Sequence, residues 1–325
     1  MNDPILEIKN LNTCFDNGYS RIHAVNNVSF NVQRGEILGI VGESGSGKSV
    51  ACLSVLRLVP RGGRIVGGEI IFDGEDLMKK SKREMRKYRG CRISMVLQNP
   101  LTSLNPVIRI GDQVSESLLL HSKEKRGRVM SKVVDLLKAV KIPSADMQVS
   151  QYPHQLSGGM RQRVVTSIAI GCEPELLIAD ESTTALDVTI QAQVLQLLRD
   201  LRRERGLSII LVTHNLGIVA GMCDRVIVMY AGQLLEIAAT EELFANPCHP
   251  YTKGLLRSVP RLTNGKKRLI SIPGQPPDMS RVPEGCPFWP RCEQSMDICK
   301  SENPPVSTAG SGHEVKCWLY AHETR

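Results

Sequence analysis

An eight-residue, glycine-rich segment near the start of the chain has the residue types and spacing needed to bind phosphate groups. It fits the pattern G-x-x-x-x-G-K-S/T, and its residues are Gly42, Glu43, Ser44, Gly45, Ser46, Gly47, Lys48 and Ser49. In such a loop the backbone N–H groups point at the phosphates, and the helix that follows adds its positive end. We expect Lys48 to neutralise the β- and γ-phosphates and Ser49 to place its hydroxyl on Mg²⁺. The segment, together with Val50, therefore predicts a site for ATP and Mg²⁺.

A second candidate group lies at the end of an apolar run. Residues 176–179 are Leu, Leu, Ile and Ala, and Asp180 and Glu181 follow them. We expect a buried strand to bring Asp180 to the metal, and Glu181 to polarise the water that attacks the γ-phosphate. The alternative is that this is simply a strand end with two solvated acids. The presence of the phosphate-binding segment makes this alternative the weaker interpretation.

A third segment lies between these two and resembles the signature sequence of ABC ATPases. It is similar to LSGGQ and consists of Leu156, Ser157, Gly158, Gly159 and Met160, with Met160 in the fifth position. Like the first segment, it is a glycine-rich turn before a helix, so it offers backbone donors to a phosphate. The resemblance implies that the signature of one subunit faces the phosphate-binding loop of another across a shared ATP.

Other landmarks of this family follow in order along the chain. The resemblance assigns Gln98 to the loop that senses Mg²⁺ and the membrane partner, and Asp187 to the D-loop. It assigns His214 to the switch position that holds the γ-phosphate and the attacking water. Phe15 resembles the aromatic residue that stacks on adenine, with Tyr19 as the alternative.

Short apolar runs alternate with helical patterns, which predicts an α/β fold. Strands are predicted at 37–41, 93–97, 176–179, 208–213 and 225–230, and helices at 48–58, 129–140, 160–170 and 190–205. The resemblance implies a P-loop ABC ATPase domain over 1–247, with a RecA-like core and a helical signature subdomain at about 100–170. Beyond it, frequent prolines predict a small, loop-rich extension over 248–325 with little core of its own.

Several stretches are similar to the ATPases of oligopeptide and dipeptide importers, namely QNPLTSLNP at 98–106, YAGQ at 230–233 and HPYT at 249–252. Three residues depart from that pattern. Leu97 replaces a common Phe, Ser182 stands where Pro is usual, and Asn215 stands where Asp is usual. None of these changes removes a catalytic group, although Ser182 leaves free a backbone angle that Pro would fix.

The resemblance implies a subunit that hydrolyses ATP to drive peptide uptake across the cytoplasmic membrane. Its implied partners are a second, homologous ATPase subunit in a heterodimer, two transmembrane permease subunits and, through these, an extracytoplasmic substrate-binding protein. We expect the stretch 98–106 to contact a permease subunit, with Leu101 and Leu104 exposed. Importers of nickel, glutathione or another small solute are alternatives, because substrate choice lies mostly in other subunits. A non-transport ABC ATPase is a weaker alternative. DNA-repair members of the family carry a long coiled coil in this region, and residues 49–156 contain no heptads for one.

Composition and charge suit a peripheral subunit. The 325 residues contain no apolar run near the eighteen or so needed to span a bilayer. Residues 1–10 lack the basic start and apolar stretch of a signal peptide, so we expect the protein at the cytoplasmic face of the plasma membrane. The net charge of +8 indicates a solvated basic surface and no nucleic-acid partner, because the densest basic stretch, 79–92, contains a single aromatic residue.

Four of the ten cysteines crowd together near the end of the sequence: Cys286, Cys292, Cys299 and Cys317. Four thiolates can hold a zinc ion or an iron–sulfur cluster. The intervals between them are wider than in zinc knuckles, and a disulfide is disfavoured in the cytosol. The resemblance points to a 4Fe–4S cluster, with zinc or unliganded thiols as alternatives. In each case the site would mainly staple a segment that lacks a core.

Overall fold

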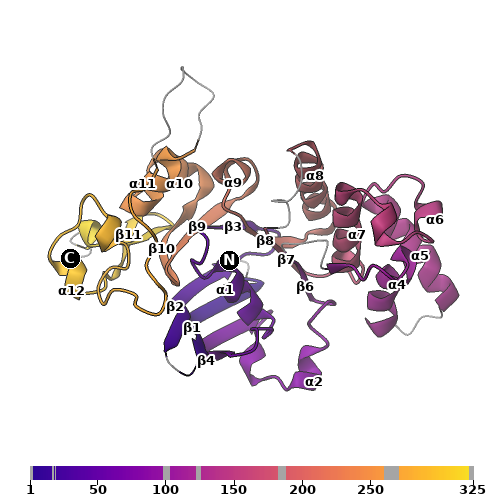
Figure 1. The fold of residues 1–325 in the computed structure, drawn as a ribbon, viewed down its shortest axis with the longest axis horizontal. Helices are drawn as coiled ribbons and strands as arrows, with labels where there is room; N and C mark the ends of the chain where they lie inside the picture. The colour runs from indigo at the N-terminus through magenta and orange to yellow at the C-terminus, as the bar shows by residue number, and fades with distance from the viewer. Residues whose placement is uncertain are drawn as a thin grey trace, which may run out of the picture. The chain divides into compact units, whose positions relative to one another are not determined.

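The computed structural model describes residues 3–16, 18, 20–97, 103–121, 126–181, 188–259 and 271–321 (Figure 1). The chain divides into two compact units, each assembled from separated parts of the sequence. The first unit contains Met1–Ile5, Gln33–Glu36 and Lys79–Ile210, and the second contains Leu6–Val32, Ile37–Met78 and Leu211–Arg325.

The first unit combines parallel strands with a group of helices. β6 (Ile93–Val96) and β7 (Leu176–Asp180) run parallel, with Val96 opposite Ala179. The helices are α2 (Lys82–Met85), α4 (Ile110–His121), α5 (Arg126–Ala139), α6 (Ala145–Gln148), α7 (Gly158–Ile170) and α8 (Val188–Arg205). In Figure 1, α4 to α7 gather around one another. α8 is amphipathic, because its buried residues, Val194, Leu197, Leu198 and Leu201, recur at helical spacing.

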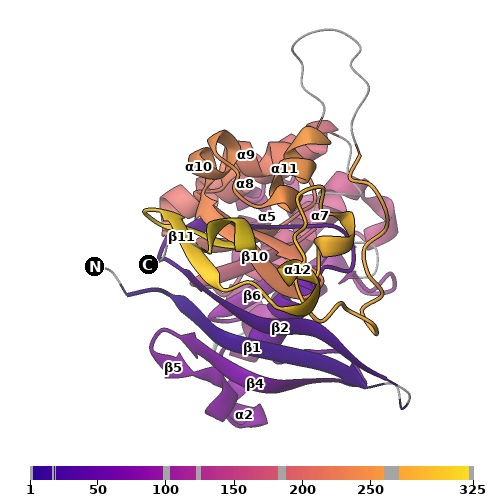
Figure 2. The same ribbon diagram turned by 90° about the vertical axis from the view of Figure 1, so that its left-hand side faces the viewer.

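An antiparallel sheet in the order β2-β1-β4-β5 forms one layer of the second unit (Figure 2). Its strands are β1 (Leu6–Asp16), β2 (Arg21–Val32), β4 (Gly63–Phe72) and β5 (Glu75–Asp76). The pairing of β1 with β2 shifts register between Ile8 and Cys14, and such irregularities bend and twist a long strand. Apolar side chains of this sheet, including Leu6 and Leu11, are fully buried.

A second sheet carries the phosphate-binding segment. Within the second unit its order is β11-β12-β10-β9-β3. The strands are β3 (Ile37–Val41), β9 (Arg225–Tyr230), β10 (Gln233–Ala239), β11 (Val306–Gly310) and β12 (His313–Lys316). β3 and β9 are parallel, whereas β10, β12 and β11 are antiparallel neighbours. Every residue of β3 is buried, as expected for a parallel strand that is covered on both faces.

The remaining elements are one strand and several helices. β8 (Ser208–Val212) runs from the first unit into the second. The second unit also contains α1 (Lys48–Val55), α9 (Leu216–Met222), α10 (Thr240–Ala245), α11 (Pro250–Arg257) and the short α12 (Ile298–Ser301). No helix among the described residues has both the length and the apolar content to span a membrane.

The predicted strands and helices are present, each end lying within three residues of its predicted position. The predicted boundary at residue 247 stays a prediction. The structure groups residues beyond it with β3 and α1 in the second unit, where β11 and β12 extend the sheet. Val315 and Cys317 of the extension form a small buried cluster with Cys248.

The prediction that Leu104 is exposed is wrong, because its side chain is only 4% exposed. Gln113 of α4 bonds both the N–H and the C=O of Asn105, which folds this turn back onto α4. The exposed apolar side chains nearby are instead Val107 and Ile108. Leu101 lies outside the described residues.

Candidate ATP site and cysteine-rich extension

The phosphate-binding segment forms a closed loop between β3 and α1. Lys48, the first residue of α1, is 5% exposed and points back into the loop. Its ammonium group donates to the carbonyl oxygens of Gly42 (2.9 Å) and Glu43 (2.8 Å) and to Ser46 Oγ (3.2 Å). The loop therefore holds a buried cation at the positive end of a helix, an arrangement suited to bind the terminal phosphates of a nucleotide.

Two glycines of the loop meet backbone that leaves no room for a side chain. Gly42 has φ 153°, and a Cβ there would collide with the carbonyl oxygen of Met229 in β9. Gly47 has φ 96°, and a Cβ there would collide with the carbonyl oxygen of Ala24 in β2. The loop is thus held between β9 and β2, and only glycine fits these two positions.

His214 leaves the sheet beside the loop. The N–H of Thr213 donates to the carbonyl oxygen of Ile40 at 3.1 Å, so the end of β8 lies next to the end of β3. Gly42, Glu43 and His214 are among the residues that line a cavity of about 340 Å³. Asn215 accepts a hydrogen bond from the N–H of Gly217 and caps α9, a position where Asn and Asp serve equally well.

The acidic pair follows β7 as predicted. Asp180 is the last residue of the strand and is 5% exposed. Glu181 adopts φ 43°, in the left-handed region that side-chain-bearing residues rarely enter, and such strain is often found at functional sites. Because Val96 lies opposite Ala179, β6 and β7 end at the same edge of the sheet. Gln98, Ser182 and Asp187 lie outside the described residues, as does Tyr19.

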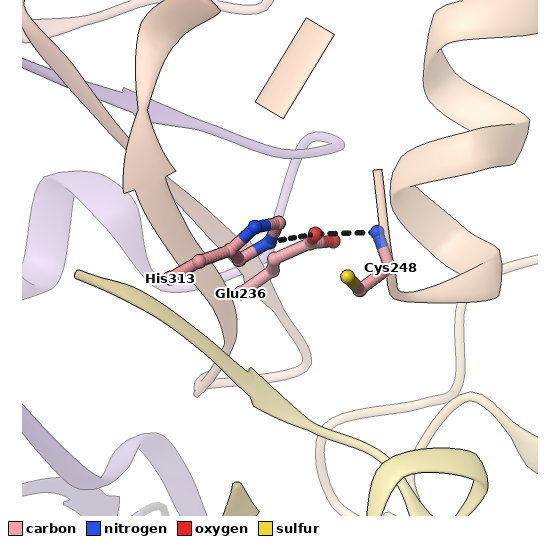
Figure 3. A group of neighbouring side chains, drawn as sticks. All are labelled: Glu236, Cys248 and His313. Carbon is pink, nitrogen blue, oxygen red and sulfur yellow. Dashed lines mark hydrogen bonds and ion pairs between the residues drawn. The ribbon is translucent and has the colours of Figure 1, made fainter. Parts of the chain in front are cut away.

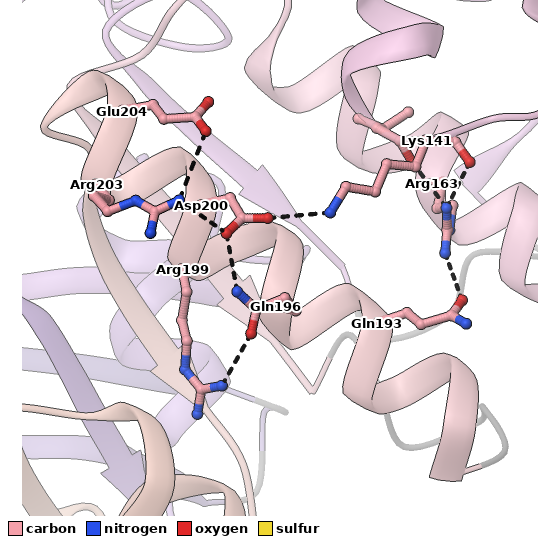
Figure 4. Close-up of polar contacts among 9 residues, drawn as sticks. Lys141, Arg163, Gln193, Gln196, Arg199, Asp200, Arg203 and Glu204 are labelled. Atoms are coloured by element: carbon pink, nitrogen blue, oxygen red, sulfur yellow. Dashed lines mark hydrogen bonds and ion pairs between the residues drawn. The ribbon is translucent and has the colours of Figure 1, made fainter.

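The signature segment opens α7. Ser157 caps the helix by accepting a hydrogen bond from the N–H of Met160 at 3.3 Å. The Arg163 side chain, one turn further on, donates to the carbonyl oxygens of Val140 and Lys141 and to the Gln193 side chain of α8 (Figure 4). The signature helix is therefore tied to the end of α5 and to α8.

A second polar link joins the same elements. Lys141 donates to Asp200 of α8 at 3.1 Å, beside Gln196 (Figure 4). Hydrogen bonds from Gln196 and Lys141 lower the pKa of Asp200. The link lies at the surface, so it orients the helices more than it stabilises them.

Phe15 lies near the end of β1 and is partly buried. Its ring packs against the backbone of Gly63 in β4, the residue opposite it in the sheet. One edge of the ring is therefore covered within the sheet. Its predicted stacking on adenine stays a prediction.

The four cysteines of the extension neighbour one another in the second unit. Cys286, Cys299 and Cys317 are buried, and Cys292 is partly buried. Each sulfur accepts a hydrogen bond from a backbone N–H group. Phe288 donates to Cys286, Gln294 donates to Cys292, and Met296 donates to Cys299. Leu319 donates to Cys317. Burial raises the pKa of Cys286 to about 11 and that of Cys317 to about 12, and the neighbouring thiols add to both increases. Four thiols with preformed N–H donors are a donor set for a thiophilic metal centre.

A buried carboxylate ties the extension to the ATPase sheet (Figure 3). Glu236 of β10 is fully buried and accepts hydrogen bonds from the N–H groups of Cys248 (2.7 Å) and His249 (2.9 Å). His313 of β12 lies 2.8 Å from the same carboxylate. Sequence reasoning missed this group, although a single acid within the apolar strand QLLEIAA was a usable signal.

The trio of Glu236, Cys248 and His313 has ligating atoms within 4.8 Å of one another. The two Glu236 oxygens, however, already accept three hydrogen bonds. We therefore interpret the trio as a structural joint. His249 beside it caps α11, and burial lowers its pKa to about 3, so this imidazole is neutral at physiological pH.

The buried β3, the glycine-rich loop and α1 define the class of P-loop ATPases with an α/β core. The sequence profile of the ABC transporter family matches residues 25–184, and that of the oligopeptide/dipeptide transporter C-terminal region matches residues 235–299. The dipeptide transport ATP-binding protein DppD of Bacillus subtilis is 46% identical over 98% of this chain and 95% of its own length. The oligopeptide transport ATP-binding protein OppD of Escherichia coli is 46% identical over 99% of this chain and 95% of its own.

Solved structures agree with this likeness. A dimeric ATP-binding cassette in a post-hydrolysis state with ADP and Pi matches with a TM-score of 0.66 at 26% identity, over 72% of this chain and 98% of that one. The cassette cbiO1 of Clostridium perfringens, part of the ABC transporter complex cbiONQ, matches with a TM-score of 0.65 at 29% identity, over 75% of this chain and 92% of that one. The chain belongs to the ATP-binding proteins of ABC transporters, in the oligopeptide/dipeptide transporter family. It is an ATPase of the class that couples ATP hydrolysis to transport.

Proposed function

We propose that this chain is the ATP-hydrolysing subunit of an importer for dipeptides or oligopeptides. The observation that carries the proposal is the closed loop between β3 and α1, in which a buried Lys48 lies at the start of a helix. The names of relatives that match nearly the whole chain favour peptides as the cargo. Importers of nickel, glutathione or another small solute are the second candidate, because substrate choice lies mostly in other subunits.

In this proposal the residues of the second unit bind the nucleotide. The loop from Gly42 to Val50 surrounds the phosphates, Ser49 binds Mg²⁺, and Phe15 stacks on adenine. His214 holds the γ-phosphate, since it leaves the sheet beside the loop. From the resemblance, we assign Gln98 and Asp180 to contacts with Mg²⁺ and its water, and Glu181 to positioning the attacking water.

The signature supports a shared site between two ATPase subunits. Ser157 and Gly159 lie at the N-terminus of the thirteen-residue α7, where backbone N–H groups attract phosphate. We propose that they complete the ATP site of a homologous partner subunit, with Asp187 at the contact. The matching cassette that was solved as a dimer favours this arrangement.

We further propose that two permease subunits hold the ATPase pair at the cytoplasmic face of the membrane, with a substrate-binding protein on the other side. Val107 and Ile108 support a permease contact, because they expose 78% and 39% of their area directly before α4. Exposed apolar side chains next to one another are typical of a docking surface.

The experiment that tests the proposal is ATP binding by the Lys48→Ala variant of the full chain. Loss of the buried cation should weaken binding of a fluorescent ATP analogue by about tenfold or more, because the terminal phosphates lose their charge partner. The control is Lys138→Ala, an exposed lysine of α5. Unchanged binding by Lys48→Ala would overturn the assignment of the loop.

We also propose that Cys286, Cys292, Cys299 and Cys317 hold a 4Fe–4S cluster. N–H donors to all four sulfurs support it, because such bonds stabilise thiolate ligands of clusters. A zinc ion would bring the four sulfurs within about 4 Å of one another. Among the described residues, the ligating atoms that all lie within 4.8 Å of one another belong to Glu236, Cys248 and His313. The four cysteine sulfurs do not form such a group. A cluster would supply four covalent anchors to a segment with little core.

The test is iron and sulfide analysis of protein made without air, together with the visible absorbance of the cluster. We expect about four iron and four sulfide per chain, and loss of both in Cys299→Ser. The matched control is Cys172→Ser, whose thiol lies in the first unit and should leave iron content unchanged. Stoichiometric zinc without iron, or neither metal, would contradict the proposal.

A further inference from the structure

The second residue of the phosphate-binding loop is held by the cysteine-rich extension. The Glu43 carboxylate accepts two hydrogen bonds from the guanidinium of Arg291, from Nη1 at 2.6 Å and from Nη2 at 3.1 Å. The two residues are 248 positions apart in sequence. Paired bonds of this kind between a guanidinium and a carboxylate fix both direction and distance.

Every polar group of Glu43 has a partner in the second unit. Its N–H donates to the Tyr251 hydroxyl oxygen at 2.9 Å, and its carbonyl oxygen accepts from Lys48 at 2.8 Å. The conformation of Glu43 is therefore set by Lys48 of α1, by Tyr251 of α11 and by Arg291 of the turn Trp289–Arg291. A change at the carboxylate would be felt at the carbonyl that holds Lys48.

Arg291 is itself held firmly. Its side chain is 5% exposed, Nε donates to the carbonyl oxygen of Pro273 at 2.8 Å, and Nη1 also lies 3.3 Å from the Tyr230 hydroxyl. The guanidinium carbon lies 5.8 Å and 6.0 Å from the ring centres of Tyr230 and Phe288. A lysine could not reproduce these contacts, because it lacks the planar fork.

The same short segment carries two of the four cysteines. Arg291 ends the turn Trp289–Arg291, directly before Cys292, and Phe288 donates its N–H to the sulfur of Cys286. Arg291 also lines the cavity that Gly42, Glu43 and His214 line. The turn that carries Cys286 and Cys292 is therefore joined to the phosphate-binding loop by the buried side chain of Arg291.

We infer that Arg291 is a positioning residue for ATP binding, through which the cysteine-rich extension sets the conformation of the phosphate-binding loop. The inference rests on the proposed ATP-binding role of the loop. Without Arg291, the Glu43 carboxylate would be left unneutralised beside the site of the nucleotide phosphates, and it would repel them. Ordering of the segment around Cys286 and Cys292 would then favour the loop conformation that binds ATP.

The test measures affinity for a fluorescent ATP analogue in the full chain, and KM and kcat for ATP in the assembled transporter. Arg291→Met should weaken binding and raise KM by about tenfold, with a smaller effect on kcat, because the loop and not the attacking water is disturbed. Arg291→Lys should fall between Arg291→Met and the wild type. The matched control is Arg281→Met, an exposed arginine of the extension, which should bind as the wild type does.

The decisive variant combines Arg291→Met with Glu43→Gln. Removing both charges leaves no unneutralised carboxylate, so the double variant should regain most of the lost affinity. Wild-type affinity in Arg291→Met, or equal losses in the single and double variants, would overturn the inference. Lys48→Ala distinguishes failure of the proposed function from failure of this inference. If Lys48→Ala binds ATP with wild-type affinity, the proposed function of the loop is wrong. If Lys48→Ala loses affinity while the Arg291 variants keep it, only the positioning role of Arg291 is refuted.

Discussion

At the scale of single residues, the ATP site combines buried charge with backbone that only glycine can adopt. Lys48 is buried and bonded to carbonyl oxygens of its own loop, so a bound nucleotide would replace those weak partners by phosphate oxygens. Glu181 follows a fully buried strand and has a left-handed backbone conformation. The pattern of glycines with Lys48 is specific enough to single out this candidate site in the sequence. The strain at Glu181 has no sequence signal.

Glu181→Gln tests the proposed catalytic role at this scale. The substitution keeps the shape of the side chain and removes its charge, so ATP should still bind. Turnover in the assembled transporter should fall by about 100-fold or more, because the group that polarises the attacking water is lost. Steady-state hydrolysis and nucleotide binding are compared with those of Glu204→Gln, an exposed acid of α8. Normal turnover in Glu181→Gln would contradict the role.

At the scale of elements, apolar runs account for the strands that were predicted. β3, β7, β8 and β9 are short, almost wholly apolar and buried, so the pattern alone reveals them. The sheet of β1, β2 and β4 was not predicted. Polar residues and glycines interrupt its strands, as in GRIVGGEIIF of β4, and its pairing includes register shifts that no simple alternation describes.

The hairpin of β11 and β12 was missed for another reason. Its sequences, VSTAG and HEVK, are too polar to predict strands, and pairing with β10 stabilises them instead. Glu236 and His313 support that pairing, since they bond across the two strands. Contacts of this kind depend on the fold and cannot be derived from local sequence.

Glu236→Gln tests the joint between β10, β12 and α11. An amide offers one acceptor oxygen in place of two and brings an N–H₂ group toward backbone donors. We expect a loss of about 2–3 kcal/mol in the free energy of unfolding, because a buried donor is left without a partner. Thermal unfolding should show a lower Tm than in Glu314→Gln, an exposed acid of the same hairpin. Equal Tm values for the two variants would show that the joint contributes little.

At the scale of the whole molecule, the extension is joined to the ATPase sheet at several places. β12 pairs with β10, Glu236 binds the residues that precede α11, and Arg291 binds the phosphate-binding loop. The sequence predicted a stapled appendage, and the four cysteines do neighbour one another. It did not predict that the appendage reaches the loop, because Glu43 and Arg291 are too far apart in sequence for any local pattern to connect them.

The central claim is that this chain hydrolyses ATP to drive peptide uptake as part of a larger assembly. The most direct measurement is ATP hydrolysis and uptake of labelled dipeptides and oligopeptides by the transporter reconstituted in liposomes. We expect peptide to stimulate hydrolysis, Lys48→Ala to abolish both activities, and the isolated chain to hydrolyse ATP slowly, because its signature serves a partner's site. Stimulation by nickel or glutathione without any by peptide would contradict the claim, as would uptake that persists in Lys48→Ala.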